Sequence, residues 1–186
     1  MSRIGLKPLK LAKGVTVLSD ASGVVTVKGP KGTVKFAAAP SVKVVVEGET
    51  VRVERKGESK HDRSCHGLVR SVLENHIQGV QTPFTRILDI QGVGYQAAKK
   101  GKQLTLKVGF SNEVVLEPPE GVTFDLPSAT RIVVTGCDLQ LVGQFAAKVR
   151  SVRPPEPYNG KGIKYDNERI QRKAGKSFAS AGASGA

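Results

Sequence analysis

Two short runs of the 186-residue sequence match parts of nucleotide-binding loops. The run Ala174-Gly175-Lys176-Ser177 matches the end of a phosphate-binding P-loop, and Gly92-Val93-Gly94 matches the first two glycines of a dinucleotide-binding turn. Each run lacks the rest of its motif, because a P-loop needs a glycine where Ile170 stands and a dinucleotide turn needs a third glycine and a following helix. The second run therefore predicts a tight backbone bend, and neither predicts a bound cofactor.

A third pattern brings possible metal ligands together. His61 and Cys65 have the i, i+4 spacing of one helix face. A structural zinc site takes four ligands, and the sequence has no C-x-x-C pair that would complete one. We therefore expect no metal site, and we expect both positions to lie in the core. His66 is expected to be structural or to lie at a partner surface.

The sequence contains no convincing catalytic constellation. It has no G-x-S-x-G nucleophile elbow, and no pair of carboxylates lies in an apolar context that would resemble an active site. An enzyme that acts on RNA is the competing class, and it would need a nucleophile or a metal set. The sequence therefore predicts a protein that is not an enzyme and has no small-molecule substrate.

The charge of the chain points to a polyanionic partner. Lysine and arginine total 29 against 16 acidic residues, which gives a formal net charge of +13. The electrostatic field of such a positive net charge attracts nucleic acids and anionic membrane surfaces. No apolar stretch approaches the roughly 20 residues that span a bilayer, and the N-terminus lacks the apolar region of a signal peptide. With only two cysteines, the expected compartment is the reducing cytosol, with no membrane partner.

The pattern of apolar residues predicts an α+β fold. Residues 15–55 read as short strands separated by turns, and residues 60–78 have the spacing of a helix that buries Cys65 and Leu68 and ends at Gly79. The turn Gly29-Pro30-Lys31-Gly32 has the G-x-x-G form of a KH clamp, but strands flank it, so a hairpin is expected. Lys28 and Lys31 stay candidates for phosphate contact.

The second half repeats this order of elements. Strand-like runs between residues 104 and 135 precede a helix that Asp138 caps and Pro154-Pro155 ends. An offset of 80 residues aligns the sequence VRSV at 69–72 with VRSV at 149–152, and it aligns valines of several strands as well. Because the matches are collinear, they indicate an internal duplication.

We therefore predict two tandem domains, each with a small, mainly antiparallel sheet and one helix. The expected bounds are 1–82 for the N-terminal domain, 83–176 for the C-terminal domain with its extension, and 177–186 for a flexible tail. Residues 153–176 lie outside the repeat, and their seven cations against three acids leave a local net charge of +4. Such an extension is suited to contact a phosphate backbone.

The run Pro155-Glu156-Pro157-Tyr158-Asn159-Gly160-Lys161-Gly162-Ile163-Lys164-Tyr165 strongly resembles the C-terminal signature of the sixth large-subunit ribosomal protein family, bacterial type. The resemblance covers essentially the whole chain. It extends to the runs Ser2–Gly5, Val27–Gly32, Arg63–Arg70, Gly92–Tyr95 and Arg172–Lys176. Two departures stand in the signature: Asn159 replaces a usual lysine, and Lys164 replaces a common arginine, which keeps the charge but loses the bidentate fork.

The resemblance implies a structural protein of the cytoplasmic ribosome. Members of the family bind 23S ribosomal RNA near the stalk base, the sarcin–ricin loop and the factor-binding region, beside neighbouring ribosomal proteins and translation factors. The C-terminal domain and its tail make most of the RNA contacts. The competing class is a free DNA- or messenger-RNA-binding module, which would form a soluble pool outside ribosomes.

The candidate RNA-binding residues are ten. Cationic side chains are expected to contact phosphates, the glycines to let the backbone approach RNA closely, and the tyrosine either to stack on a base or to pin its loop. The set is Arg153, Tyr158, Gly160, Lys161, Gly162, Lys164, Arg169, Arg172, Lys173 and Lys176.

Overall fold

The computed structural model describes residues 4–20 and 22–173, and it confirms the α+β class. The first half of the chain forms β1 (Leu9–Lys10), β2 (Thr16–Ser19), β3 (Val24–Gly29), β4 (Gly32–Ala37), β5 (Val42–Glu47), β6 (Thr50–Arg55) and α1 (Lys60–Gln81). The second half forms β7 (Phe84–Gln91), β8 (Gln96–Lys100), β9 (Gln103–Lys107), β10 (Val114–Leu116), β11 (Val122–Ser128), β12 (Arg131–Gly136), α2 (Leu139–Val152) and β13 (Gly162–Tyr165). The duplicated order of strands followed by a helix is present as predicted.

The described residues form two compact units. The first contains the described residues up to Arg86 together with Pro119–Phe124 and Val134–Phe145. The second contains Ile87–Pro118, Asp125–Val133 and the described residues from Ala146 onwards. Segments of the second repeat thus belong to the first unit, and the domain bounds stated above stay predictions.

Antiparallel strands build the sheets of the first half. The orders are β2-β3-β4 in one sheet and β1-β6-β5 in another. Buried and exposed residues alternate over part of β5 and of β6, so that Val42, Val44, Val51 and Val53 enter the core while Lys43 and Arg52 between them are exposed. This alternation is the period of a strand with one face in the core. The tight turn Gly29–Gly32 joins β3 to β4, and the predicted hairpin is therefore confirmed.

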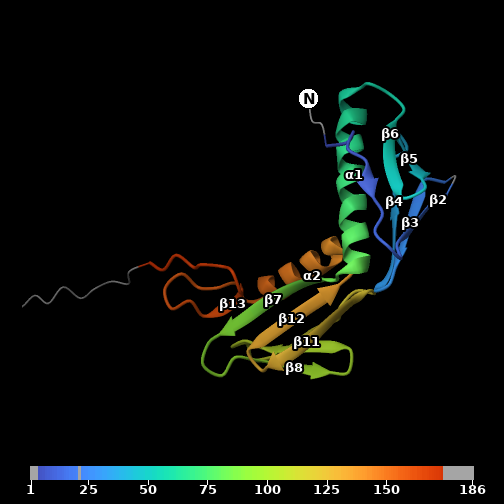
Figure 1. The fold of residues 1–186 in the computed structure, drawn as a ribbon. Coiled ribbons are helices and arrows are strands. Elements are labelled where there is room, and N and C mark those ends of the chain that lie inside the picture. Colours follow the sequence, from blue (N-terminus) through green and yellow to red (C-terminus); the bar gives the residue numbers. More distant parts are fainter. Residues whose placement is uncertain (1–3, 21, 174–186) are drawn as a thin grey trace, which may run out of the picture. The chain divides into compact units, whose positions relative to one another are not determined.

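Helix α1 covers strands β3, β4, β5 and β6 (Figure 1). Its N-terminus is held by a capping box, in which the Ser59 hydroxyl accepts from the Asp62 amide and the Asp62 carboxylate accepts from the Ser59 amide. The buried positions recur at helical spacing, as expected for a helix with one face in the core. They include Val69, Leu73, Ile77 and Val80.

Three expectations for α1 were wrong. His61 is exposed because it lies in the first turn of the helix, and Leu68 is 63% exposed because it lies opposite the buried stripe. Gly79 does not end the helix, which continues to Gln81. Instead Gly79 is buried where the Cys137 backbone approaches the helix, so this glycine makes room for a neighbour rather than a cap.

The strands after α1 form two further sheets. One has four strands in the order β11-β12-β7-β13, and the other has three in the order β10-β9-β8. Helix α2 begins as predicted, because the amide of Gln140 donates to the Asp138 carboxylate at 2.8 Å. One face of the helix is buried at Val142, Phe145 and Val149. Among the described residues, no helix is both long and apolar enough to cross a membrane.

Candidate nucleic-acid interface

The family-like signature run folds into a closed loop followed by an edge strand. The Gly160 amide donates to the Glu156 carbonyl at 2.9 Å, and the Glu156 amide donates to the Lys161 carbonyl at 2.8 Å. Residues Gly162–Tyr165 then form β13, which pairs antiparallel with β7 and buries Ile163 completely. The sequence did not predict this strand, because its four residues lack a clear alternation. The extension is therefore fixed to the sheet at this point.

The two glycines of the signature are required by the chain itself. Gly160 has a φ of +73°, and Gly162 has a φ of +138°, both in the region that favours glycine. A Cβ atom at Gly162 would lie 2.6 Å from the Pro154 carbonyl oxygen, and one at Gly160 would lie 3.2 Å from the Arg172 guanidinium. Both glycines are buried. Their role within the loop is thus explained by local packing, and their approach to RNA stays a prediction.

Most candidate cations of the extension are exposed. Arg153 lies over the Phe110 ring, with its guanidinium carbon 5.3 Å from the ring centroid. This contact orients a long side chain that would otherwise be mobile. Lys164 differs, because it is half-buried in β13 directly across from Asp89. The exposed set is Arg153, Lys161, Arg169, Arg172 and Lys173, while Lys176 lies outside the described residues.

The acidic residues beyond β13 are paired with arginines of the same unit. Arg150 of α2 donates to both carboxylate oxygens of Glu168, at 2.9 Å through its Nε atom, and the Tyr165 amide donates to Glu168 at 3.2 Å. Arg131 contacts Asp166 at 3.0 Å. Because these two carboxylates are occupied, they offset the exposed lysines and arginines of the extension less than free acids would, whereas the Glu156 carboxylate is exposed in the loop. Arg131 and Arg150 were missed by sequence reasoning, since their partners lie 35 and 18 residues away.

The Arg150–Glu168 pair makes the stability of the extension depend on pH. The hydrogen bond from Arg150 holds the pKa of Glu168 below its ordinary value of 4.5. A carboxyl with a lowered folded pKa stabilises the fold above its unfolded pKa, and that contribution is lost as the pH falls through the folded value.

We expect Glu168→Gln to lower the free energy of unfolding by about 1–2 kcal/mol at neutral pH, because the charged hydrogen bonds are weakened. The difference between wild type and variant should shrink below pH 4.5 and vanish once the carboxyl is protonated. Urea denaturation measured from pH 7 down to pH 3 checks this. A difference that is constant over the whole range would contradict the assignment.

The other motifs of the sequence find structural explanations. Gly92 and Gly94 both have positive φ, and the predicted tight bend between them leaves Val93 95% exposed. Cys65 packs against the core cluster, half-buried, with its Sγ atom 3.4 Å from His61 Nε2. His66 is buried and its Nε2 atom lies 2.7 Å from the Val53 carbonyl, so it is structural. The run at 174–177 lies outside the described residues.

The hairpin turn at Gly29–Gly32 is held against the end of α1. The Lys31 amide donates to the Val80 carbonyl at 3.0 Å, and the Cys137 thiol donates to the Lys31 carbonyl at 3.3 Å. The side chains of Lys28 and Lys31 remain exposed. Within the described residues, no group of three histidine, cysteine or acidic side chains could hold a metal ion.

A duplicated α+β protein with a basic, loop-forming extension belongs to the class of structural nucleic-acid-binding proteins. The sequence model of the protein family described as ribosomal protein L6 matches residues 11–82 and 91–166 of the chain. The chain is 50% identical to the large ribosomal subunit protein uL6 of Syntrophomonas wolfei over 95% of this chain and 98% of that protein. It is 49% identical to that of Clostridioides difficile over the same shares and 46% identical to that of Roseiflexus over 95% and 97%.

The chain belongs to the ribosomal protein L6 family. It is therefore a structural component of the large ribosomal subunit in the cytoplasm and not an enzyme, as the sequence predicted. The resemblance of the signature run is confirmed, and so are the two tandem repeats, since the family model matches the chain twice.

Proposed function

We propose that the chain binds 23S ribosomal RNA through its C-terminal extension and stabilises the RNA fold near the stalk base, the sarcin–ricin loop and the factor-binding region. The observation that carries the proposal is the closed loop at residues 156–161 and the segment that follows it. This segment carries exposed cations, its loop is closed by backbone hydrogen bonds, and its Glu168 and Asp166 are paired with arginines. Neighbouring ribosomal proteins and translation factors would lie close to this region.

The physical basis of the binding is the release of counterions. Each lysine or arginine that contacts a phosphate releases condensed counterions from the RNA, so that affinity falls steeply with salt. Folded RNA is read largely through its shape, its phosphates and its 2′-hydroxyls. A loop held rigidly before binding loses less conformational freedom on binding than a flexible arm would. The anchored extension is therefore better suited to this role than a free tail.

The position on the RNA is tested by footprinting. Full-length protein is added to 23S ribosomal RNA, and hydroxyl-radical cleavage of the RNA backbone is mapped with and without it. We expect protection at the sarcin–ricin loop and the stalk base. Protection confined to other regions would contradict the proposed location, and protection that disappears evenly with moderate salt at all positions would indicate non-specific binding.

Tyr158 offers a separate test of how the loop meets RNA. The residue is 53% exposed, and the loop is closed by backbone hydrogen bonds rather than by this side chain. These observations favour stacking on a base over pinning the loop. Tyr158→Ala is expected to weaken RNA binding by about 10- to 100-fold, and Tyr158→Phe to retain it, because a stacking contact is worth about 1–3 kcal/mol. Filter binding checks this, and equal affinities for both variants and wild type would contradict stacking.

A further inference from the structure

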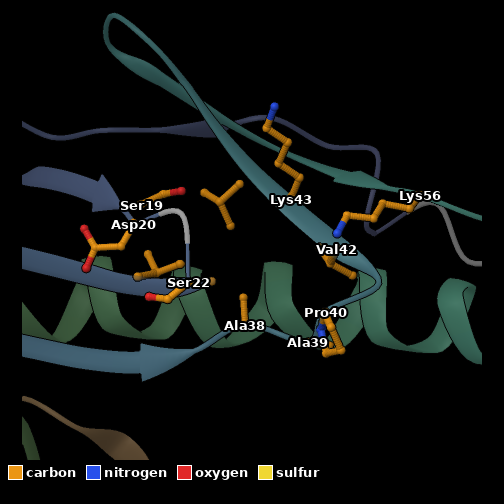
Figure 2. Close-up of a pocket in the computed structure, with 12 residues that line it drawn as sticks. Ser19, Asp20, Ser22, Ala38, Ala39, Pro40, Val42, Lys43 and Lys56 are labelled. Atoms are coloured by element: carbon orange, nitrogen blue, oxygen red, sulfur yellow. The ribbon is translucent and has the colours of Figure 1, made fainter.

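A cleft of about 560 Å³ opens in the first unit (Figure 2). Its volume falls within the range of protein sites that hold small ligands or short peptide segments. One side is formed by Ser19, Asp20, Ser22 and Gly23, and the other by the connection from β4 to β5 with the start of β5. The lining residues used below are Ser22, Val25, Val42, Lys43, Val44 and Lys56.

The cleft lies between the ends of two edge strands. β2 is the outer strand of one sheet and β5 is the outer strand of another. The two strands contact each other, yet within the described residues no ladder of backbone hydrogen bonds joins them. Edge strands that lack a ladder present backbone donors and acceptors to an added extended segment. The geometry therefore favours a ligand that is itself an extended chain.

Core valines lie beneath the cleft, and charged side chains lie at its rim. Val25, Val42 and Val44 line it and belong to the buried core. Lys43 and Lys56 are exposed at the rim, and among the described residues neither ammonium group lies in an ion pair that would neutralise it. Asp20 adds one negative charge on the opposite side, beside Ser19 and Ser22 (Figure 2). The two lysines give the β5 side of the cleft a positive potential.

We propose that this cleft binds an extended acidic segment of a protein partner. The acidic side chains of the segment would pair with Lys43 and Lys56, and its backbone would follow the edge of β5, which no other strand pairs within the described residues. None of the residues that line the cleft is aromatic, so the site lacks the stacking platform that single-stranded RNA uses. None of the lining residues is among the proposed RNA contacts, so the test of the site does not depend on them.

The probe is a short synthetic peptide in which valine and glutamate alternate, titrated into the full-length protein while backbone amide signals are followed by NMR. We expect chemical-shift changes at residues 19–25 and 42–44. A peptide with lysine in place of glutamate should bind at least about tenfold more weakly, because it loses the charged hydrogen bonds and meets like charges.

Two variants locate the binding. The double substitution Lys43→Gln with Lys56→Gln should lower the affinity for the acidic peptide at least about tenfold. Ser22→Trp should block binding of the peptide, because the exposed position lets the indole fill the cleft. The matched control is Lys10→Gln with Lys35→Gln, which removes the same charge from exposed sites on other strands and should leave affinity unchanged. NMR spectra of the free variants report whether each remains folded.

Three results would overturn the proposal. The first is no binding of the acidic peptide at millimolar concentration. The second is an equal loss of affinity in the control variant, which would show that net charge alone attracts the peptide. The third is that a single-stranded RNA oligonucleotide shifts the same cleft signals more strongly than the peptide does, which would assign the cleft to RNA.

Discussion

Replacing Gly79 by alanine is expected to cost about 3–5 kcal/mol, which is a large part of the stability of a small domain. Gly79 lies inside α1, where alanine would normally favour the helix by about 1 kcal/mol. Here the added Cβ atom would collide with the Cys137 carbonyl oxygen and lie 2.8 Å from the Phe84 ring. Because a backbone atom is involved, a change of side-chain rotamer cannot relieve the collision. Urea denaturation followed by circular dichroism measures the loss.

Gly67 provides the matched control for this prediction. It lies in the same helix, and a Cβ atom there would meet nothing within 4 Å. Gly67→Ala should therefore stabilise the protein by up to about 1 kcal/mol. If Gly79→Ala proved as stable as Gly67→Ala, the close approach of the Cys137 segment to α1 would be wrong. The pair thus separates helix propensity from packing at one end of the helix.

Removing four exposed cations of the extension should abolish most of the specific RNA binding. The variant carries alanine at Lys161, Arg169, Arg172 and Lys173. If each contacts one phosphate, the slope of log K against log salt should flatten by about three units. Affinity at 0.1 M salt should fall by about 100-fold or more, since each lost contact weakens binding by a charge-assisted hydrogen bond. A salt titration of binding to a 23S ribosomal RNA fragment measures both quantities.

The control for this variant removes four cations elsewhere. Lys10, Lys13, Lys35 and Lys60 are exposed and lie before or at the start of α1. Their replacement by alanine changes the net charge equally, so it should reproduce any effect of general electrostatic attraction. We expect the salt slope of this control to change by less than about one unit. Equal slopes for the two variants would show that the extension is not the RNA-binding site.

Local patterns in the sequence were sufficient for both helices and for many of the strands, but not for β7, β8 or β13. The valine-rich runs at β5 and β6 gave the strands, and Asp138 marked the start of α2. The repeated VRSV sequence indicated the duplication, which the family match confirms. These features can be predicted from the sequence because strand alternation, helical spacing and N-caps depend on residues only a few positions apart.

The signature run allowed a different kind of prediction, that of the family. Its eleven residues from Pro155 to Tyr165 are specific enough to identify the family, yet they did not reveal a strand. β13 exists because Ile163 becomes fully buried when residues 162–165 pair with β7, more than 70 residues earlier in the chain. Such a pairing leaves no local trace in a segment of four residues. The identity of the family was thus predictable, whereas the shape of the extension was not.

The sequence by itself determined the fold class, the repeat, the strongly basic character and the family. Tertiary structure alone decided that Arg150 would hold Glu168, that Gly79 would admit the Cys137 carbonyl, and that β2 and β5 would leave a cleft between them. The physical reason is distance along the chain. Propensity, capping and charge are properties of neighbouring residues, whereas ion pairs, close backbone approaches and clefts arise from segments that only folding brings together.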